Sequence, residues 1–433
     1  MSFELDPIRL GDVAEIFTGY PFKGADYLPA QSGIRVVRGD NVTERSLRWG
    51  EKEKCWQQIT PELKPYLLQA GDVVVGMDGS KVGKNFAWIS PSDGPCLLAQ
   101  RVARIRGRKD LNQTFLRYLI CNPRFTQYVQ SIHTGTSIPH ISKRQIEDFR
   151  VVVPPMAEQL AIGALLKRID DRISLLLESN ATLEAMAKTL FKSWFVDFDP
   201  VRAKVEGREP EGLDAGTAEL FSDSFEDVGS GSIPTGWHWG VLGELAQTAR
   251  EQRQPSDLDD ETHYVGLEHI PRQSLGLTDW GTAGGLESAK SSFKGGDVLF
   301  GKLRPYFHKV VVAPFDGVCS TDILVCRSKK EAFYGLVAMH LFSKSLVDYA
   351  DRLSNGAKMP RVNWKDLAAY PIAVPPEPIA DCFSKVATPL IQSIVANVLH
   401  ARTLADLRDA LLPRLISGQL RLPDAEALLQ DAA

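Results

Sequence analysis

The sequence predicts a mixed α/β protein made of two tandem, pseudo-symmetric copies of one domain, with a long helix after each copy. Two observations lead to this prediction. Short motifs of the first half return in the same order in the second half, and each copy ends in a Pro-Pro pair followed by an extended helical pattern. The recurrence distance, as from Leu10 to Leu242, is far above the roughly 20–50 residues of solenoid repeats. It therefore indicates a duplicated domain.

The duplication rests on four recurring motifs. They are LGDVA at 10–14 with LGELA at 242–246, GDVVVG at 71–76 with GDVLFG at 296–301, VVVPP at 151–155 with IAVPP at 372–376, and Gly135 and Pro139 with Gly356 and Pro360. The offset between equivalent positions shrinks only slightly along the chain. The two copies therefore differ by small changes in length, and a two-fold pseudo-symmetric molecule of this kind suits a target with two parts.

The sequence of each copy predicts short strands, with helices near the end of the copy. Runs at 34–37 and 73–75 are β-branched and bounded by glycine, and 102–105 alternates apolar and basic residues, as strands do. The first copy should also contain a helix over 115–131 and a last strand at 151–153, stopped by the prolines. The second copy should repeat this plan with strands near 298–300, 310–313 and 323–326 and a helix near 332–353.

After each Pro-Pro pair, apolar residues step by four and three alternately, which is the spacing of a coiled-coil seam. The first seam is Ile162, Leu166, Ile169, Ile173, Leu176, Asn180, Leu183, Ala187, Leu190 and Trp194. The equivalent second seam is Phe383, Ala387, Leu390, Ile394, Asn397, Ala401, Leu404, Arg408, Leu411 and Leu415.

Polar residues interrupt both seams. Asn180 occupies a position where a buried polar residue fixes register. Asn397 and Arg408 interrupt the second seam, and Pro389 should begin or kink its helix. A helix over 162–194 would be about 50 Å long. Two interpretations stay open: a two-helix coiled coil between the copies, or two amphipathic helices that each pack on their own domain.

These patterns divide the chain into six parts. The copies are expected at 1–155 and 237–376, and the long helices at 156–196 and 377–417. Residues 197–236 are acidic, poor in apolar side chains and rich in glycine, so they are expected to form an exposed linker. Residues 418–433 are expected to be a C-terminal tail.

The net charge of −4 conceals a segregation of charge along the chain. Residues 1–150 carry 21 Lys and Arg against 16 Asp and Glu, whereas 200–236 carry 3 against 8. Within 94–146 there are nine basic residues and a single acid, Asp110, and 298–315 contains Lys302, Arg304, His308 and Lys309 with no acid. One such run could be a solvated face. Two runs in corresponding places of two repeats favour contact with phosphate groups.

Several classes of function are disfavoured by what the sequence lacks. The six cysteines never fall at C-x-x-C spacing, which argues against a zinc site and favours a reducing cytoplasm. We expect neither a signal peptide nor a membrane-spanning segment. Residues 76–85 resemble a phosphate loop, but the spacing fails, and Asn85 stands where a Ser or Thr must hold magnesium. Without a dinucleotide, zinc-protease or hydrolase motif, a self-sufficient enzyme is not expected.

Taken together, the chain resembles the specificity subunit of Type I restriction–modification enzymes over essentially its full length. The sharpest matches are FVDFDPVRAK at 195–204 with Gly207 and Arg208, GDVLFGKLRPY at 296–306, and GSIPTGW at 231–237. The resemblance implies two target-recognition domains separated by an antiparallel coiled coil that sets their spacing. It also implies that each domain reads one half of a bipartite, asymmetric DNA target, and that one specificity chain docks two modification subunits, with restriction and translocase subunits joining for phage defence.

The same resemblance implies a non-catalytic chain that binds no cofactor or metal itself. S-adenosylmethionine, and ATP and Mg²⁺ for restriction, would be used by the other subunits of the complex. The protein would act on double-stranded DNA in the cytoplasm, with no role for a membrane.

Loop residues that could donate to bases or phosphates are the candidates for DNA contact. In the first domain they are Tyr20, Phe22, Lys23, Arg38, Asn41, Ser80, Lys81, Lys84, Thr134, Thr136 and His140. In the second they are Lys302, Arg304, Tyr306, His308, Lys309, Lys358 and Arg361. Asn41 could pair with adenine, and Arg304 or Arg361 with guanine; each of them could equally be a surface or turn residue.

Two hypotheses from other classes remain. A stand-alone DNA methyltransferase or nuclease should bind S-adenosylmethionine or cleave DNA unaided. A duplicated coiled-coil scaffold that binds proteins should show no salt-dependent affinity for DNA.

Overall fold

The computed structural model describes residues 6–132, 139–229, 231–354, 359–417 and 419–431. The chain divides into two compact units. Unit 1 comprises Met1–Asp171 with Thr403–Ala433, and unit 2 comprises Arg172–Arg402. Each unit therefore contains one repeat together with part of both long helices, so the helices are shared between the units instead of standing apart from the domains.

Unit 1 contains two four-stranded sheets. The first is antiparallel, in the order β2 (Ala14–Thr18), β11 (Val102–Gly107), β8 (Val73–Gly76) and β9 (Phe86–Trp88). The second has the order β6 (Cys55–Trp56), β3 (Ile34–Val37), β10 (Cys96–Leu98) and β7 (Leu67–Leu68), and its two central strands are parallel. Val74, Val37 and Leu98 are among the buried residues that join the two sheets in one core.

Unit 2 repeats this topology. Its first sheet has the order β16 (Ala246–Thr248), β24 (Ile323–Ser328), β21 (Val298–Gly301) and β22 (Val310–Val312). Its second has the order β17 (Gln252–Arg253), β20 (Lys290–Phe293), β23 (Gly317–Cys319), β18 (His263–Val265) and β19 (Gly281–Thr282), again with one parallel pair, β18 and β23. The duplicated mixed α/β fold predicted from the sequence is confirmed.

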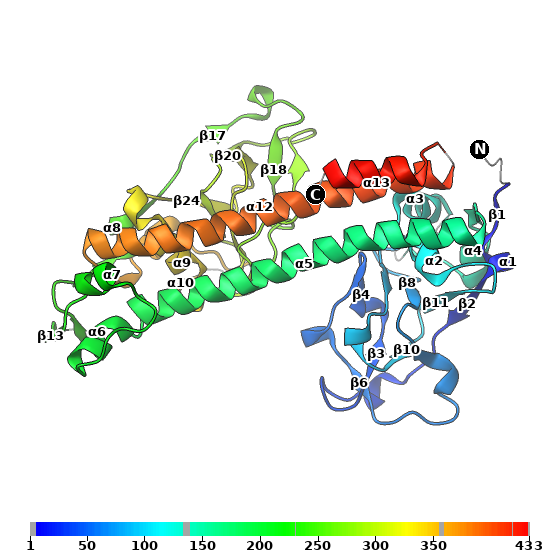
Figure 1. Cartoon of the computed structure of the whole chain (residues 1–433), viewed down its shortest axis with the longest axis horizontal. Coiled ribbons are helices and arrows are strands. Elements are labelled where there is room, and N and C mark those ends of the chain that lie inside the picture. The colour runs from blue at the N-terminus through cyan, green and yellow to red at the C-terminus, as the bar shows by residue number, and fades with distance from the viewer. Residues whose placement is uncertain (1–5, 133–138, 230, 355–358, 418, 432–433) are drawn as a thin grey trace. The chain divides into compact units, whose positions relative to one another are not determined.

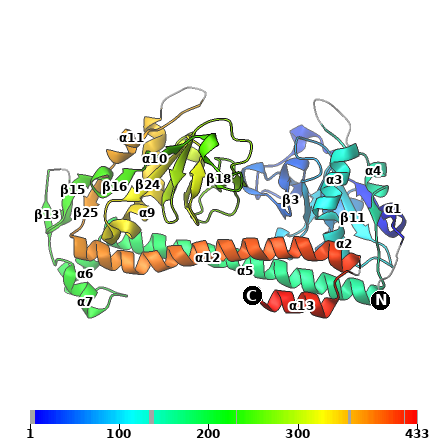
Figure 2. The ribbon, with the colours of Figure 1, turned by 90° about the horizontal axis from the view of Figure 1, so that it is seen from above.

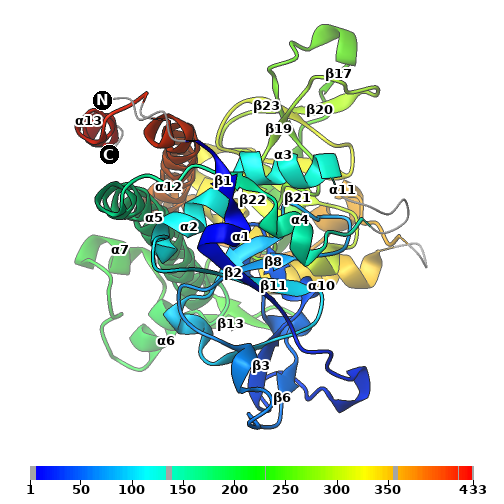
Figure 3. The ribbon, with the colours of Figure 1, turned by 90° about the vertical axis from the view of Figure 1, so that its right-hand side faces the viewer.

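The recurring LG motif has a packing reason. In unit 1, α1 (Leu10–Val13) lies against α4 (Lys143–Glu147) (Figure 3), and a Cβ on Gly11 would come within 2.9 Å of the Glu147 Cβ. In unit 2, α8 (Leu242–Leu245) meets α11 (Trp364–Ala368), and a Cβ on Gly243 would come within 3.0 Å of the Ala368 Cβ. The glycine is needed in both copies because a short helix crosses it closely.

Each repeat closes with a small two-stranded sheet that joins its beginning to its end. β1 (Ile8–Arg9) pairs with β12 (Arg150–Val151), and β15 (His238–Val241) pairs with β25 (Pro371–Val374). The strand expected at 151–153 therefore exists but starts one residue earlier and ends at Val151.

The single helices expected at 115–131 and 332–353 are each two helices. In unit 1 they are α2 (Gln113–Ile120) and α3 (Pro123–Ile132), because the chain cannot stay helical into Pro123. In unit 2 a 3₁₀ turn, Glu331–Phe333, precedes α9 (Tyr334–Phe342) and α10 (Lys344–Leu353), and the Ser343 hydroxyl caps α10 by accepting from the Leu346 N–H.

The two long helices are α5 (Met156–Phe195) and α12 (Glu377–Ile416), within one residue of the predicted bounds. In unit 2 the Asn180 side chain meets that of Asn397, whereas the Phe195 ring lies 4.9 Å from that of Phe383. Residues further along α5 therefore meet residues earlier in α12, so the helices are antiparallel (Figure 1). α12 continues through Pro389, so the expectation that this residue begins the helix is wrong.

The predicted seams are the buried faces of these helices. Except for half-buried Ile173, Leu183, Leu190, Leu390 and Asn397, every seam position is buried. The helices also pack on the repeats: Figure 2 shows α9 beside α12, and a Cβ on Gly335 would lie 2.9 Å from the Ala387 Cβ. Both interpretations of the seams, pairing with each other and packing on a domain, therefore hold within the units.

By length and composition alone, α12 could cross a membrane, a feature that the sequence prediction did not anticipate. Its apolar residues Phe383, Ile394 and Leu404 are instead buried in protein. Of the most apolar window of this helix, 33% is buried within the structure, so burial accounts for part of the apolar composition.

The polar residues that interrupt the seams are paired with one another. Asn397 donates from Nδ2 to Oδ1 of Asn180 at 2.8 Å, and Asn180 donates to the Ile394 carbonyl at 3.2 Å. In unit 1, Arg408 forms an ion pair of 2.5 Å with buried Asp170. The second seam is therefore interrupted only in appearance, because each polar side chain has a partner on α5.

Residues 197–236 are mostly exposed, as the sequence predicts, but they are structured and do not form a simple linker. They contain α6 (Asp199–Val205), α7 (Ala215–Leu220), β13 (Phe225–Asp227) and β14 (Ser232–Pro234). Few residues here are apolar, but Phe198 packs on Trp237 and Phe221 packs on Trp194, with ring centroids 5.5 and 5.2 Å apart. These aromatic anchors order the segment despite its acidic composition.

The expected C-terminal tail contains a helix, α13 (Leu422–Asp431). Ala425 is fully buried, and Glu426 forms an ion pair of 2.7 Å with Arg168 of α5. The tail therefore belongs to unit 1.

A buried histidine makes the stability of unit 2 depend on pH. His340 lies on α9 with its ring edge-on to Phe191, and burial lowers its pKa to about 3. In the unfolded chain the pKa is about 6.5, so below that pH the unfolded state binds a proton that the folded state excludes. Stability is complete above about pH 6.5 and should fall by about 1.4 kcal/mol per pH unit toward pH 3.

Urea unfolding of the His340→Phe variant at pH 7.5 and pH 5.0 tests this. The variant should lose part of the pH dependence of the wild-type protein, because the ring is kept while its titration is removed. His238→Gln, at an exposed histidine, serves as the control and should unfold as the wild type does at both pH values. An unchanged pH dependence in His340→Phe would contradict the assignment.

Candidate nucleic-acid interface

Three loops of unit 1 that are distant in sequence are joined by backbone hydrogen bonds. The Met77 N–H donates to the Arg101 carbonyl at 2.8 Å, and the Ile141 N–H donates to the Met77 carbonyl at 2.8 Å. The Gly79 N–H donates to the Pro139 carbonyl at 3.1 Å. We call residues 77–79, 101 and 139–141 the first loop junction. It lies where β8 ends and β11 begins.

Unit 2 contains the same junction with the same three hydrogen bonds. The Lys302 N–H donates to the backbone carbonyl of Asp322 at 3.0 Å, and the Val362 N–H donates to the Lys302 carbonyl at 3.1 Å. The Arg304 N–H donates to the Pro360 carbonyl at 2.8 Å. Residues 302–304, 322 and 360–362 form the second loop junction. The proline that recurs in the sequence thus marks one structural feature, present in both units.

The side chains on the two junctions differ. The first presents Asp78, Arg101 and His140, and Arg101 forms an ion pair of 3.7 Å with Asp78. At the equivalent positions the second presents Leu303, Asp322 and Arg361, and Arg361 forms an ion pair of 3.3 Å with Asp322. The two junctions therefore share one backbone arrangement and carry different charged groups on it.

Ser80, Lys81 and Lys84 of the predicted set lie directly after the first junction and are exposed. Gly79 and Gly83 have positive φ values of 97° and 88°, so they form the turn that presents the two lysines. A cavity of about 460 Å³ is lined by Glu44, Ser80, Lys81, Val82, Lys84 and Gln130. The turn could therefore contact phosphate groups. His140 lies next to it, because its backbone forms an antiparallel β-bridge with that of Asp78.

Tyr20 and Phe22 belong to a half-buried aromatic cluster. The ring of Phe22 lies 4.7 Å from that of Trp56, and the Tyr20 hydroxyl donates to Glu62 at 3.0 Å. Tyr20 also accepts from Gln100 at 2.8 Å through its carbonyl, next to Arg101. Its backbone therefore borders the first junction while its ring packs internally. Lys23 is exposed at the start of the following turn.

The hypothesis that Asn41 pairs with adenine is wrong for this structure. Asn41 is fully buried: its oxygen accepts from the Arg38 N–H, and its nitrogen donates to the Arg48 and Lys52 carbonyls at 3.0 and 3.2 Å. The amide holds a turn together, and both of its N–H groups are used there, so none is left to donate to adenine. Arg38 also supports this turn, donating to the Lys52 carbonyl at 3.0 Å.

In unit 2, Lys302, Arg304 and Arg361 come together at the second junction. Arg304 has a positive φ of 51° and precedes a 3₁₀ turn, Pro305–Phe307, that leaves Tyr306 half exposed. Three basic residues and an aromatic side chain thus lie near one another, and Arg361 is paired with Asp322.

His308 and Lys309 do not belong to that surface. His308 is buried, its ring nitrogen Nε2 lies 3.0 Å from the Phe342 carbonyl, and burial lowers its pKa. The ammonium of Lys309 donates to the Leu267 carbonyl, and burial together with nearby Arg272 lowers its pKa. Their predicted role in DNA contact is wrong, because both side chains serve the fold.

The basic run at 94–146 is also partly structural. Arg104 pairs with Glu15, Arg106 with Asp72 and Arg117 with Asp170. A further pair, Arg327 with Asp297, repeats the Arg106 pair in unit 2. Charge counts along the sequence therefore overstate the cations available to DNA.

Two exposed arginines at or beside the junctions were not among the predicted residues. Arg101 belongs to the first junction, and Arg272 stacks over Phe307 at 4.0 Å. Arg101 occupies the position in the first repeat that Asp322 occupies in the second, so alignment of the two repeats could have found it. Thr134, Thr136 and Lys358 lie outside the described residues.

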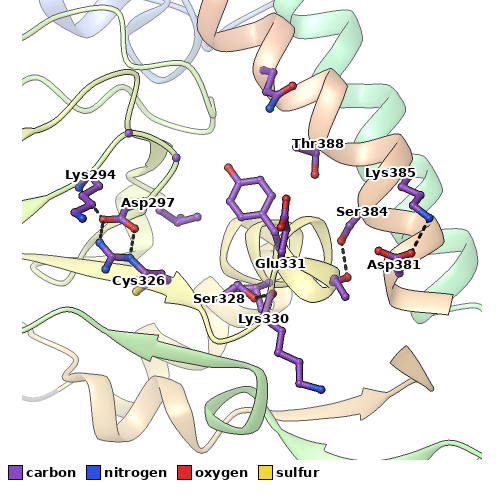
Figure 4. Close-up of a pocket in the computed structure, with 18 of the residues that line it drawn as sticks. Lys294, Asp297, Cys326, Ser328, Lys330, Glu331, Asp381, Ser384, Lys385 and Thr388 are labelled. Atoms are coloured by element: carbon purple, nitrogen blue, oxygen red, sulfur yellow. Dashed lines mark hydrogen bonds and ion pairs between the residues drawn. The ribbon is translucent and has the colours of Figure 1, made fainter. Parts of the chain in front are cut away.

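A cavity of about 900 Å³ lies in unit 2 between β21, β24, α9 and α12 (Figure 4). Asp297 pairs with Arg327, and Figure 4 shows Lys385 and Asp381 paired along α12. The cavity shares no lining residue with the second junction. Within the described part of the chain, no three His, Cys, Asp or Glu side chains gather as a metal site would require.

Comparisons with known proteins agree with this architecture. Residues 4–185 match the family described as the Type I restriction modification DNA specificity domain. The chain is 23% identical to the Type I restriction enzyme MjaIX specificity subunit of Methanocaldococcus jannaschii, over 90% of this chain and 84% of that protein. It is 27% identical to the EcoDI specificity subunit of Escherichia coli, over 68% and 71% of the two chains.

Among solved structures, the Type I restriction–modification S subunit from M. genitalium superimposes with a TM-score of 0.52 at 14% identity, covering 95% of this chain and 96% of that one. At this identity the superposition supports the fold alone. The matches in sequence lead to one conclusion: over residues 4–185 and over most of the length of these relatives, the chain is similar to the specificity subunits of Type I restriction enzymes.

Proposed function

We propose that each unit of this chain reads one half of a bipartite, asymmetric double-stranded DNA target. The observation that carries the proposal is the pair of loop junctions, which share three backbone hydrogen bonds and differ in their charged side chains. A shared scaffold places the reading loops at the same point of each unit. Different side chains on that scaffold select different bases, because base edges are distinguished by their donors and acceptors.

The lysines next to the junctions supply contacts to the DNA backbone. Exposed Lys81 and Lys84 adjoin the first junction, and half-buried Lys302 belongs to the second. Contacts of lysine with phosphate position a protein on the duplex without reading sequence. Binding should therefore weaken as salt concentration rises.

The remaining parts of the proposal concern the assembly. One specificity chain docks two modification subunits through the helices α5 and α12 and the segments next to them, and these helices set the distance between the half-targets. Restriction and translocase subunits join this complex. S-adenosylmethionine, and ATP and Mg²⁺ for restriction, are bound by the other subunits, and the complex acts in the cytoplasm.

Exchanging residues 6–155 for the corresponding segment of another specificity subunit should change one half of the methylated target and leave the other half intact. The segment ends just before α5, so the helices and unit 2 are kept. The measurement is the methylated adenines in cells that express the chain with its modification subunit. Exchange of 237–376 serves as the matched control and should change the opposite half. A continuous target, or an exchange that alters both halves, would refute the proposal.

A further inference from the structure

The two junctions carry opposite charges at one equivalent position. Arg101 and Asp322 each lie one residue before the matching strands β11 and β24. Each accepts the first hydrogen bond of its junction through its carbonyl, from Met77 and Lys302 respectively. His140 and Arg361 are likewise equivalent, because each directly follows the proline of its junction. Each junction thus presents one of these arginines from a different place: Arg101 from the turn before β11 in unit 1, and Arg361 from the loop after Pro360 in unit 2.

Asp322 holds Arg361 by one edge of its guanidinium. The Nε atom lies 3.3 Å from Oδ1 and the Nη2 atom 3.4 Å from Oδ2, and the Arg361 side chain is 53% exposed. A guanidinium held through Nε and Nη2 keeps the N–H groups on its outer edge, Nη1 and Nη2, as donors. That edge matches the O6 and N7 acceptors of guanine.

Arg101 is presented by strained backbone. Its φ is +71°, a left-handed conformation that is unusual for an arginine. The side chain is 59% exposed, with its Nε 3.7 Å from Asp78 Oδ2. Strain of this kind at an exposed turn indicates that the side chain is kept for a purpose other than stability.

A carboxylate beside each arginine favours a base over a phosphate. The Arg101–Asp78 and Arg361–Asp322 pairs are close to neutral, and their carboxylates would repel a phosphate. A guanine edge offers two neutral acceptors to the arginine, and a neighbouring cytosine amino group could donate to the carboxylate.

We infer that positions 101 and 322 determine base reading in the two units: Arg101 contacts guanine in one half-target, and Asp322 positions Arg361 to contact guanine in the other. This inference rests on the proposed function. It goes beyond it by naming the residues, the base, and the different positions from which the two units present their arginines.

The test is the methylated sequence obtained with the full chain and its modification subunit, for Arg101→Lys, Arg361→Lys and Asp322→Asn. Lysine keeps a phosphate contact but loses two-point donation to guanine. Each lysine variant should relax one guanine position in one half-target, with discrimination falling by roughly ten-fold to a hundred-fold, while the other half stays unchanged. Asp322→Asn should relax the same position as Arg361→Lys, to a smaller extent.

Arg101→Gly separates this effect from misfolding, because glycine adopts the left-handed turn without strain and should still relax the position. Arg253→Lys, at an exposed arginine outside the junctions, should leave the target unchanged. If the wild-type target is bipartite but these variants weaken methylation equally at all sequences, or relax positions other than guanine, the inference is overturned while the proposed function stands. A wild-type target that is not bipartite overturns both.

Discussion

Replacing Asp170 with alanine should lower the free energy of unfolding of unit 1 by about 3–5 kcal/mol. Asp170 of α5 is buried and accepts from Arg408 of α12 at 2.5 Å, from Arg117 of α2 at 2.5 Å and from the Tyr118 hydroxyl at 2.7 Å. The substitution would strand the half-buried Arg117 guanidinium and leave the buried Arg408 guanidinium with Asp409 alone. Breaking a buried ion pair by removing one partner costs several kcal/mol. Urea unfolding monitored by circular dichroism measures the loss.

The next residue along α5 provides the control. Asp171 pairs with Lys167 in an exposed i,i+4 contact, and such contacts contribute only a few tenths of a kcal/mol. Asp171→Ala should therefore unfold almost as the wild type does. The double variant Asp170→Leu/Arg408→Met should recover part of the stability lost in Asp170→Ala, because it removes one of the stranded cations. Equal, small effects of Asp170→Ala and Asp171→Ala would contradict the role given to this network.

Leu176→Asp should disrupt folding of unit 2 and assembly with the modification subunit more than it changes the DNA target. Leu176 is a seam residue of α5 and is 7% exposed, so an aspartate there would place a carboxylate without a partner in the interior, at a cost of several kcal/mol. Thermal unfolding and co-purification with the modification subunit measure the two losses.

The neighbouring Leu175 is 52% exposed, which makes Leu175→Asp a matched control with the same chemistry. It should unfold within about 0.5 kcal/mol of the wild type. A Leu176→Asp variant that assembles normally and methylates a different sequence would show that the seam is part of the reading surface, against the role assigned to it here.

The sequence by itself determined the duplication, most of the strands and both long helices. These features are local or periodic: β-branched runs bounded by glycine, a four-and-three apolar spacing, and motifs such as LGDVA that recur because Gly11 and Gly243 are each crossed by a short helix. The seam positions were correct for the same reason, since helical periodicity alone decides which face is apolar. The recurrence of Pro139 as Pro360 also marked the two loop junctions before their geometry was known.

Only the tertiary structure decided which polar residues face the interior. Asp170 and Arg408 lie on different helices that are far apart in the chain, so no local pattern shows that the arginine interrupting the second seam has a partner on the first helix. Asn41 and His308 look like exposed loop residues in sequence, yet the turns around them bury their side chains and use their hydrogen-bonding groups.

The acidic segment at 197–236 is ordered by Phe198 and Phe221, two anchors that average composition does not reveal. Arg101 was missed because a turn arginine has no sequence signal of its own. Alignment of the two repeats matches it with Asp322, but only the folded chain places it beside Asp78. Burial and long-range pairing depend on the whole folded chain, and that is why they could not be predicted from local sequence.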